Sequence, residues 1–395
     1  MTIRRLLAVS HEATLTGAPM NLLHLVRWIS EETSTEVHVL ILRDGPLRHR
    51  FEEVAETTVL DTSPISAALG TVQQGLRHLG SSRAWKPFAE LRLRPQLRSL
   101  NDFDLVYLNS LGSLAMLPYL PAARHVACHV HELQVALTTQ PDDLQELLRN
   151  GPDVWIAASH AVRNMLVDET GLPGDRVLLH HEFIDTAPFV DHRSDARRAN
   201  RMRRELQLHP ETAVVMGAGT IDWRKGTELF IQLGTEVRRR TRHPVRFLWV
   251  GGDLTGVDAR RLHSDLTRAD ADHVTFLGTK PEPLEWFELA DVFALTSHED
   301  PYPLVCLEHA AMGHPIVTYR NGGMPELLEA AGPEAALGVV DFLDVGALAD
   351  RTIALLDSET LYQQAAAQLR AHVIAEHDVS VAAPQLYEDL TRLTA

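Results

Sequence analysis

The feature that most constrains this chain is an alternation of short apolar runs with helical patterns, which occurs twice. In the first half the apolar runs are RRLLAVS, EVHVLIL, TTVL, LVYLNS, HVACHVH, VWIAAS and RVLLHH. The alternation restarts after residue 191 with AVVMGAG, VRFLWVGG, HVTFLG, DVFALTS, PIVTY and LGVV. Fully apolar strands between helices are typical of parallel sheets covered on both faces. The sequence therefore predicts two α/β domains, each with a Rossmann-like, doubly wound parallel sheet.

The change of domain is marked by the segment DHRSDARRANRMRREL, which is arginine-rich and has no strand pattern. We predict a first domain over residues 1–190, a second over 191–375, and a C-terminal helix over 376–395 that crosses back to the first domain. Ligands of open α/β sheets bind at the carboxyl ends of the strands. We therefore expect the two domains to face a central cleft lined by these strand ends.

Composition excludes several classes of protein. The chain of 395 residues has a formal net charge of −16, which argues against nucleic-acid binding through a generally basic surface. The sequence contains two cysteines, both in apolar runs, and neither a signal peptide nor a bilayer-spanning segment is apparent. We expect a cytoplasmic protein.

One stretch, RHLGSSRAWKPFAELRLRPQLR over residues 77–98, is locally basic and interleaved with apolar residues. Such a stretch suits peripheral contact with an anionic membrane surface. A solvated basic helix face and a groove for an anionic acceptor are the two alternatives.

The stretch DPYPLVCLEHAAMG places two acids, Asp300 and Glu308, eight positions apart. Proline suits the first turn of a helix, so we expect a helix to begin at Pro303 and leave the amides of Leu304 and Val305 unpaired. Such amides bind phosphate. Glu308 lies on an apolar segment, where a carboxylate needs partners, and ribose hydroxyls would serve. The alternative is a surface glutamate on a half-exposed helix.

The stretch GAGTIDWRKGTELF places Arg224 and Lys225 at a turn between a strand and a helix. Two adjacent cations there suit a diphosphate. The alternative is a solvated turn. In both cases we expect a turn lysine to bury little of its side chain. The pair Gly217 and Gly219 resembles the start of a dinucleotide motif, but Asp222 stands where the third glycine would be, so that match is weak.

Two further motifs lie in the first domain. The loop SHEATLTGAP precedes a helix, so the amides at Gly17 and Ala18 are candidates for hydrogen bonds to a phosphate or a sugar. His131 follows a strand in HVACHVHEL and is a candidate donor to a substrate group, unless its role is structural. His129 and His131 share one strand face, but no further ligands stand at recognisable spacing, so we predict no metal site.

Together these motifs resemble those of the retaining glycosyltransferases of family four, which have the GT-B fold. The resemblance covers nearly the whole chain in order: the Gly17 loop, His131, then WIAASHAVRNML, WRKG, LWVGG, FLG, the two acids and PIVTYRNGGMPEL. It implies hexosyl transfer from a nucleotide diphosphate sugar to a small-molecule, glycan or lipid-linked acceptor. It implies no cofactor besides that donor. The first domain would bind the acceptor and the second the nucleotide sugar.

The resemblance also implies roles for individual residues. Glu308 would hold the nucleotide ribose, Asp300 would contact the donor sugar, and His131 would bind the transferred sugar. The other residues implied in the site are the cations Arg224 and Lys225 against the diphosphate, and the donor-binding residues Gly17, Leu304, Val305, Asn321, Gly322 and Gly323. Three departures stand out: Thr220 replaces a frequent arginine, Asp300 replaces the usual glutamate, and residues 301–303 read Pro-Tyr-Pro instead of glycine-aromatic-glycine.

Other functions remain open at this point. A nucleotide-sugar epimerase or a phosphorylase would use the same fold. A nicotinamide-dependent oxidoreductase would also have Rossmann-like halves, although the missing third glycine argues against it. A protein that binds nucleotide sugars without turnover is the third alternative, because of the departures at Thr220 and Asp300.

Overall fold

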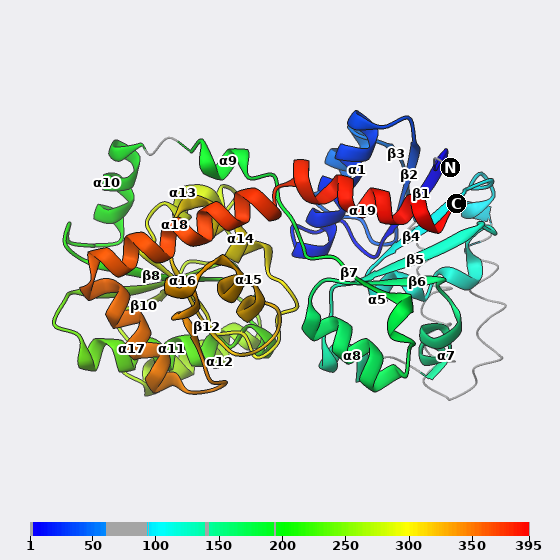
Figure 1. The fold of residues 1–395 in the computed structure, drawn as a ribbon. Coiled ribbons are helices and arrows are strands. Elements are labelled where there is room, and N and C mark those ends of the chain that lie inside the picture. The colour runs from blue at the N-terminus through cyan, green and yellow to red at the C-terminus, as the bar shows by residue number, and fades with distance from the viewer. Residues whose placement is uncertain (1–2, 61–92, 94, 139–141, 193–194, 395) are drawn as a thin grey trace. The chain divides into compact units, whose positions relative to one another are not determined.

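A computed structural model describes residues 3–60, 93, 95–138, 142–192 and 195–394 of the chain. It divides the chain into two compact units: unit 1 comprises Met1–His181 with Val379–Ala395, and unit 2 comprises Glu182–Asp378. The boundaries expected from the sequence fell after residues 190 and 375. Each unit is built around its own parallel sheet, as the alternating pattern predicts (Figure 1).

Unit 1 holds a seven-stranded sheet in the order β3-β2-β1-β4-β5-β6-β7. All neighbouring strands are parallel. The chain winds outward from β1 first in one direction and then in the other, so the order reverses between β1 and β4. The strands are β1 Arg5–Ser10, β2 Glu36–Ile41, β3 Glu56–Val59, β4 Leu105–Asn109, β5 His125–Val130, β6 Val154–Ala157 and β7 Val177–Leu179.

Helices cover both faces of this sheet, and the C-terminal helix α19 lies beside α1 (Figure 1). The hydroxyl groups of Thr35 and Tyr387 are 2.6 Å apart, and the ring of Tyr387 packs 5.8 Å from that of Trp28. The helices of the described part of unit 1 are α1 Gly17–Glu32, α2 Arg48–Glu52, α5 Leu111–Leu114, η1 Leu117–Tyr119, α6 Gln134–Thr138, α7 Asp142–Asn150, α8 His160–Thr170, η2 Gly174–Arg176 and α19 Val379–Leu393.

Unit 2 holds a six-stranded parallel sheet in the order β10-β9-β8-β11-β12-β13. Its order reverses between β8 and β11, which is where an open sheet of this kind binds ligands. The strands are β8 Ala213–Ala218, β9 Val245–Val250, β10 Val274–Phe276, β11 Val292–Leu295, β12 Ile316–Tyr319 and β13 Val339–Val340.

The helices of unit 2 also lie on both faces, with α11 and α17 packed together on one and α14 and α18 on the other (Figure 1). Aromatic rings of Phe230, Phe247 and Trp249 fill the core under α11. The helices of the described part of unit 2 are α9 Ala187–Val190, α10 Ala196–Glu205, η3 Trp223–Lys225, α11 Thr227–Arg240, α12 Val257–Arg268, α13 Pro283–Phe287, α14 Leu304–Met312, α15 Met324–Ala331, α16 Pro333–Ala336, α17 Val345–Asp357 and α18 Glu359–Glu376.

Membrane-spanning segments were not expected from the sequence. Among the described residues, every helix is too short or too polar to cross a bilayer. Both cysteines, Cys128 and Cys306, are buried as free thiols.

Candidate active site

The loops that follow β8, β11 and β12 in unit 2 meet at one edge of its sheet, because these three strands are neighbours. They bring together most of the residues predicted for the nucleotide sugar: Arg224, Lys225, Asp300, Asn321, Gly322 and Gly323. The helix that carries Leu304, Val305 and Glu308 begins just after the β11 loop.

The β8 loop forms a short 3-10 turn, η3, that positions Lys225. The Asp222 side chain caps this turn by accepting hydrogen bonds from the Lys225 amide at 3.1 Å and from the Thr220 hydroxyl at 2.6 Å. Gly226 ends the turn with φ of 62°, and a Cβ there would lie 2.0 Å from the carbonyl oxygen of Thr296. Thr220, which stands where the related family often has arginine, therefore supports the turn through Asp222.

Lys225 and Asp300 form a buried ion pair. The Lys225 Nζ atom lies 2.6 Å from the Asp300 carboxylate, and the two side chains are 13% and 6% exposed. The Ser297 hydroxyl also donates to this carboxylate at 2.9 Å, and the Arg224 guanidinium stands 3.8 Å away while 42% exposed. The expectation that a turn lysine buries little was wrong, because the lysine reaches inward to a buried acid.

The turn after β12 fixes the backbone of Asp300. Gly322 has φ of 64°, and a Cβ on it would lie 2.0 Å from the Asp300 carbonyl oxygen. The Gly323 amide donates to that same oxygen at 3.3 Å. The Asn321 side-chain amide donates to the carbonyl oxygen of His298. The predicted Asn-Gly-Gly turn thus packs against the acid that it was expected to adjoin.

Helix α14 begins at Leu304, with Pro303 as its N-cap residue, one position later than the sequence indicated. Proline has no backbone N–H, and its fixed φ suits the start of a helix. In the described part of the chain, the amides of Leu304 and Val305 donate no hydrogen bond. The Tyr302 hydroxyl, 3.2 Å from Nε2 of His377, anchors the loop before the helix.

Glu308 lies on α14 between the buried residues Leu307 and His309 and is itself half-buried. Burial raises the pKa of its carboxyl group to about 7. Within the described residues it has neither a hydrogen-bond partner nor an ion-pair partner. A carboxylate in this environment gains from hydroxyl donors supplied by a ligand.

The edge of the unit 1 sheet holds the other predicted residues. Nε2 of His131 is 2.9 Å from Oδ1 of Asn109, whose Nδ2 donates to the Ala18 carbonyl oxygen at 2.9 Å. Asn109 therefore connects His131 to the first turn of α1, which begins at Gly17. Burial, with a smaller contribution from His11, lowers the pKa of His131 to about 3, so its imidazole is neutral at physiological pH.

A comparison with known proteins identifies the region that holds the ion pair, α14 and the Asn-Gly-Gly turn. Residues 212–358 match the family described as "Glycosyl transferases group 1". We call this matched segment the group 1 domain. It contains every candidate site residue that the sequence analysis placed in the second domain, from Arg224 to Gly323.

Curated relatives agree with this family. A D-inositol 3-phosphate glycosyltransferase from Pseudarthrobacter chlorophenolicus is 32% identical over 162 residues, which are 40% of this chain and 37% of that protein. The match to an alpha-galactosylglucosyldiacylglycerol synthase from Streptococcus pneumoniae, 29% identical over 37% of this chain, likewise spans only 38% of that relative. A glycogen synthase from Mycobacterium tuberculosis is 25% identical over 91% of this chain and 81% of its own length.

Solved structures agree on the fold. HepE from Anabaena, in complex with UDP-glucose, superposes with a TM-score of 0.75 at 18% identity, over 98% of this chain and 99% of that chain. Sucrose-phosphate synthase from Thermosynechococcus elongatus gives a TM-score of 0.72 at 17% identity, over 99% of both chains. The predicted GT-B fold, with its two Rossmann-like domains, is thereby confirmed.

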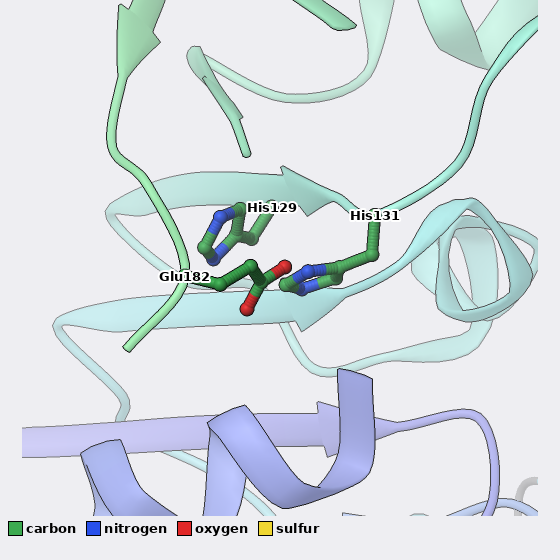
Figure 2. Close-up of side chains that lie close together, drawn as sticks. All are labelled: His129, His131 and Glu182. Atoms are coloured by element: carbon green, nitrogen blue, oxygen red, sulfur yellow. The ribbon is translucent and has the colours of Figure 1, made fainter. Parts of the chain in front are cut away.

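Outside the group 1 domain, His131 belongs to a cluster of side chains that could hold a metal ion (Figure 2). His129, His131 and Glu182 each offer a ligand atom, and these atoms lie within 4.8 Å of one another. Imidazole and carboxylate groups are ligands that zinc accepts. Nδ1 of His129 is already 2.6 Å from the Tyr107 hydroxyl. The sequence analysis expects no functional metal. That expectation stays a prediction, and the cluster of His129, His131 and Glu182 is the place to test it.

Sequence reasoning missed several residues that contact the predicted ones. Ser297 is the second residue after β11 and Asn109 ends β4, and these positions near strand ends could have marked both residues. Glu182 gave no signal, because it is 51 residues from His131 in the chain. Most of the basic stretch over 77–98 lies outside the described residues, so the expected membrane contact gains no structural support here.

Proposed function

We propose that this protein is a retaining, metal-independent glycosyltransferase that moves a sugar from a nucleotide diphosphate sugar to an acceptor hydroxyl. The observation that carries the proposal is the strand edge of the group 1 domain. There a buried cation, unbonded helix amides and a carboxylate without a partner lie on neighbouring loops and one helix. These groups match the diphosphate and the ribose of such a donor.

The diphosphate is the leaving group of the donor. When the bond between the sugar and the diphosphate breaks, negative charge grows on the diphosphate oxygens. Lys225, Arg224 and the amides of Leu304 and Val305 would stabilise that charge from positions fixed before the reaction. Four such groups can take the part that a divalent cation plays at other sites, which supports metal independence.

The nucleotide ribose would be bound by Glu308. A ribose ring offers two adjacent hydroxyl groups, and a carboxylate accepts a hydrogen bond from each. Ionising Glu308 without such donors is unfavourable, as the raised pKa of its carboxyl group indicates. The ribose would supply the donors, so nucleotide binding and ionisation of Glu308 would favour each other.

Retention follows if the acceptor oxygen attacks the face that the diphosphate leaves. In that course the acceptor oxygen bonds to the anomeric carbon, the bond to the diphosphate oxygen breaks, and the acceptor proton passes to a departing phosphate oxygen. Asp300 is held by Lys225 and Ser297, which suits a positioning residue more than a nucleophile. His131, neutral and oriented by Asn109, would hydrogen-bond a hydroxyl of the transferred sugar.

A thermal-shift screen of the full chain against UDP, GDP, ADP, dTDP and their sugars tests donor binding. A ligand that binds only the folded state stabilises it by about 2.7 kcal/mol at 100 times its Kd. We expect one nucleotide and its sugars to raise Tm. If all four nucleotides and their sugars leave Tm unchanged at millimolar concentration, the proposal fails.

Product analysis separates transfer from the other activities that this fold would support. With the donor identified by the screen, proton NMR of the products distinguishes a new α- or β-glycoside from a free sugar. A transferase consumes donor in proportion to acceptor and retains the anomeric configuration. Conversion of the donor to its epimer without acceptor would show an epimerase instead.

A further inference from the structure

We propose that Tyr302 is a positioning residue that transmits occupancy of the donor site to the two segments at which unit 2 begins and ends. This inference rests on the proposed function and adds regulation of the same site. Tyr302 lies two residues after Asp300 and two residues before Leu304, the first residue of α14. It is 4% exposed, and its hydroxyl oxygen lies 3.2 Å from Nε2 of His377.

The two ends of unit 2 are hydrogen-bonded to each other. Unit 2 begins with residues 182–186, which we call the entry segment, and ends with His377 and Asp378, which we call the exit segment. The amide of Ile184 donates to the carbonyl oxygen of His377 at 3.0 Å. The amide of Thr186 donates to the carboxylate of Asp378, also at 3.0 Å. A change at one segment is therefore felt at the other.

His377 connects Tyr302 to both segments. A carbonyl oxygen only accepts hydrogen bonds, so Nδ1 of His377, which lies 3.0 Å from the Glu182 carbonyl oxygen, carries the proton. Nε2 of the neutral ring then has a lone pair, and the Tyr302 hydroxyl donates to it. One imidazole ring in the exit segment thus joins the Tyr302 hydroxyl to the entry segment.

The loop around Tyr302 is stiff. Pro301 and Pro303 flank it, and all three residues are buried. Each proline ring holds φ near about −65°, whereas glycine would let the backbone absorb a shift. A displacement at Asp300 or at the start of α14 is therefore passed on to Tyr302.

The helices next to the two segments pack on α14 (Figure 1). The entry segment leads into α9, and the exit segment follows α18. The guanidinium of Arg370 on α18 donates to the carbonyl oxygen of Val190 on α9 at 3.2 Å. This packing holds both segments beside the helix that carries Glu308 and the unbonded amides. The Tyr302 hydroxyl supplies the hydrogen-bonded connection between them.

Donor binding would stabilise this network. Diphosphate oxygens would accept hydrogen bonds from the amides of Leu304 and Val305, and so fix the start of α14 and the loop before it. Fixing that loop would keep the Tyr302 hydroxyl on His377, which makes opening of the entry and exit segments less frequent. Such coupling is reciprocal, so closed segments would in turn favour binding.

Hydrogen–deuterium exchange of the full chain tests this link. Mass spectrometry follows peptides that cover the entry segment and residues 301–308, with and without the nucleoside diphosphate identified by the thermal-shift screen. Tyr302→Phe removes the hydroxyl and keeps the ring. His377→Asn keeps a donor for the entry segment and loses the acceptor for the tyrosine. The control is Tyr362→Phe, which removes the hydroxyl of a half-buried tyrosine on α18.

In the parent we expect the nucleoside diphosphate to slow exchange at the start of α14. It should also slow exchange in the entry segment at least about fivefold, the lower end of common coupling strengths. In Tyr302→Phe and His377→Asn the slowing at α14 should remain, while that in the entry segment should fall below about twofold. Tyr362→Phe should behave as the parent does.

The inference is overturned if the ligand slows exchange in the entry segment of Tyr302→Phe as much as in the parent. A purely structural anchor gives that result, because its loss speeds exchange equally with and without ligand. Slowing confined to α14 in the parent would also overturn it. Failure of the proposed function looks different: no nucleotide then raises Tm or slows exchange anywhere in the parent, and the inference falls with it.

Discussion

The Nζ atom of Lys225 lies 2.6 Å from the carboxylate of Asp300, and both side chains are largely buried. The pair joins the loop after β8 to the loop after β11, at the point where the order of the sheet reverses. Asp300 thus holds the cation that would meet the leaving diphosphate. Lys225 would therefore have two separable roles: it stabilises the fold by pairing with Asp300, and it supports turnover.

Replacing Lys225 should lower both the stability of the fold and the turnover. In Lys225→Ala the buried carboxylate of Asp300 loses its closest cation, so we expect a loss of about 1–3 kcal/mol in the free energy of unfolding, measured by urea denaturation. Turnover should fall on the order of 100-fold, by analogy with the loss of one oxyanion donor.

The double variant Lys225→Ala/Asp300→Ala is the control for this prediction. It leaves no buried charge unpaired, so part of the stability should return while turnover stays low. Strictly additive losses of stability would show that the two residues are not coupled. Near-parental turnover of Lys225→Ala would remove the lysine from the leaving-group site.

Gly322 should be intolerant of a side chain. In Gly322→Ala the new Cβ would lie 2.0 Å from the Asp300 carbonyl oxygen, so the turn or the acid must move. We expect a loss of stability of about 1–3 kcal/mol and weaker binding of the nucleotide sugar.

Gly313→Ala is matched to Gly322→Ala. Gly313 has φ of 86°, also in the left-handed region, but the nearest atom to a Cβ there is 3.8 Å away, on Arg370. Gly313→Ala should therefore lose only the stability that a left-handed backbone costs a residue with a side chain. It should leave the affinity for the nucleotide sugar unchanged. Equal affinity losses in both variants would contradict the role given to the turn.

Donor binding should depend on pH through Glu308. Its carboxyl group has a pKa of about 7, and the ribose is expected to bind the ionised form. Affinity is then complete above that pKa and falls as the pH drops below it. Between pH 8 and pH 6 the ionised fraction falls about tenfold, so the Kd of the nucleotide sugar identified by the thermal-shift screen should rise by about that factor.

The nucleotide sugar is a more suitable ligand than the free nucleoside diphosphate, because its diphosphate is esterified at both ends and does not titrate in this range. Calorimetry at pH 6, 7 and 8 provides the measurement, and Glu308→Gln should have no such slope. A parent protein with equal affinity at pH 6 and pH 8 would contradict the ionisation assigned to Glu308.

Activity should not need a metal. After treatment with EDTA we expect turnover to remain within twofold of the untreated protein, since cations and amides stabilise the leaving group. Loss of activity with EDTA, restored by manganese, magnesium or zinc, would refute this. If zinc alone restores it, His131→Ala would show whether the cluster of His129, His131 and Glu182 is responsible.

The fold was largely predictable because its signal is local. Each apolar run became a strand, and the neighbouring strands were predicted to be parallel, so the residues at their carboxyl ends had to meet. Lys225 and Asp300, 75 residues apart, were expected at one site from that rule together with the resemblance to family four. The helix start before Glu308 was visible from Pro303 for the same local reason.

The rest depends on side-chain geometry that no sequence pattern fixes. The side chain of a turn lysine can extend into solvent or point inward, and the sequence around it does not show which. The side chain of Lys225 points inward because it pairs with the buried carboxylate of Asp300. Hydropathy alone would bury Trp223, yet it is exposed, with its ring stacked on that of His298. The hydrogen bonds of Ser297 and Asn109 likewise depend on which strand ends lie beside each other.

The central claim is that the group 1 domain binds a nucleoside diphosphate with Glu308 on its ribose. Calorimetric titration of the nucleoside diphosphate identified by the thermal-shift screen into the parent and Glu308→Gln tests this claim most directly. Glutamine keeps the shape but offers one acceptor oxygen instead of two. Hydrogen bonds to a charged group contribute roughly 1.5–3 kcal/mol, so the account predicts about 10- to 100-fold weaker binding. The control Glu329→Gln, at an exposed position on α15, should bind as the parent does. Equal affinity of the parent and Glu308→Gln for that nucleoside diphosphate would contradict the account.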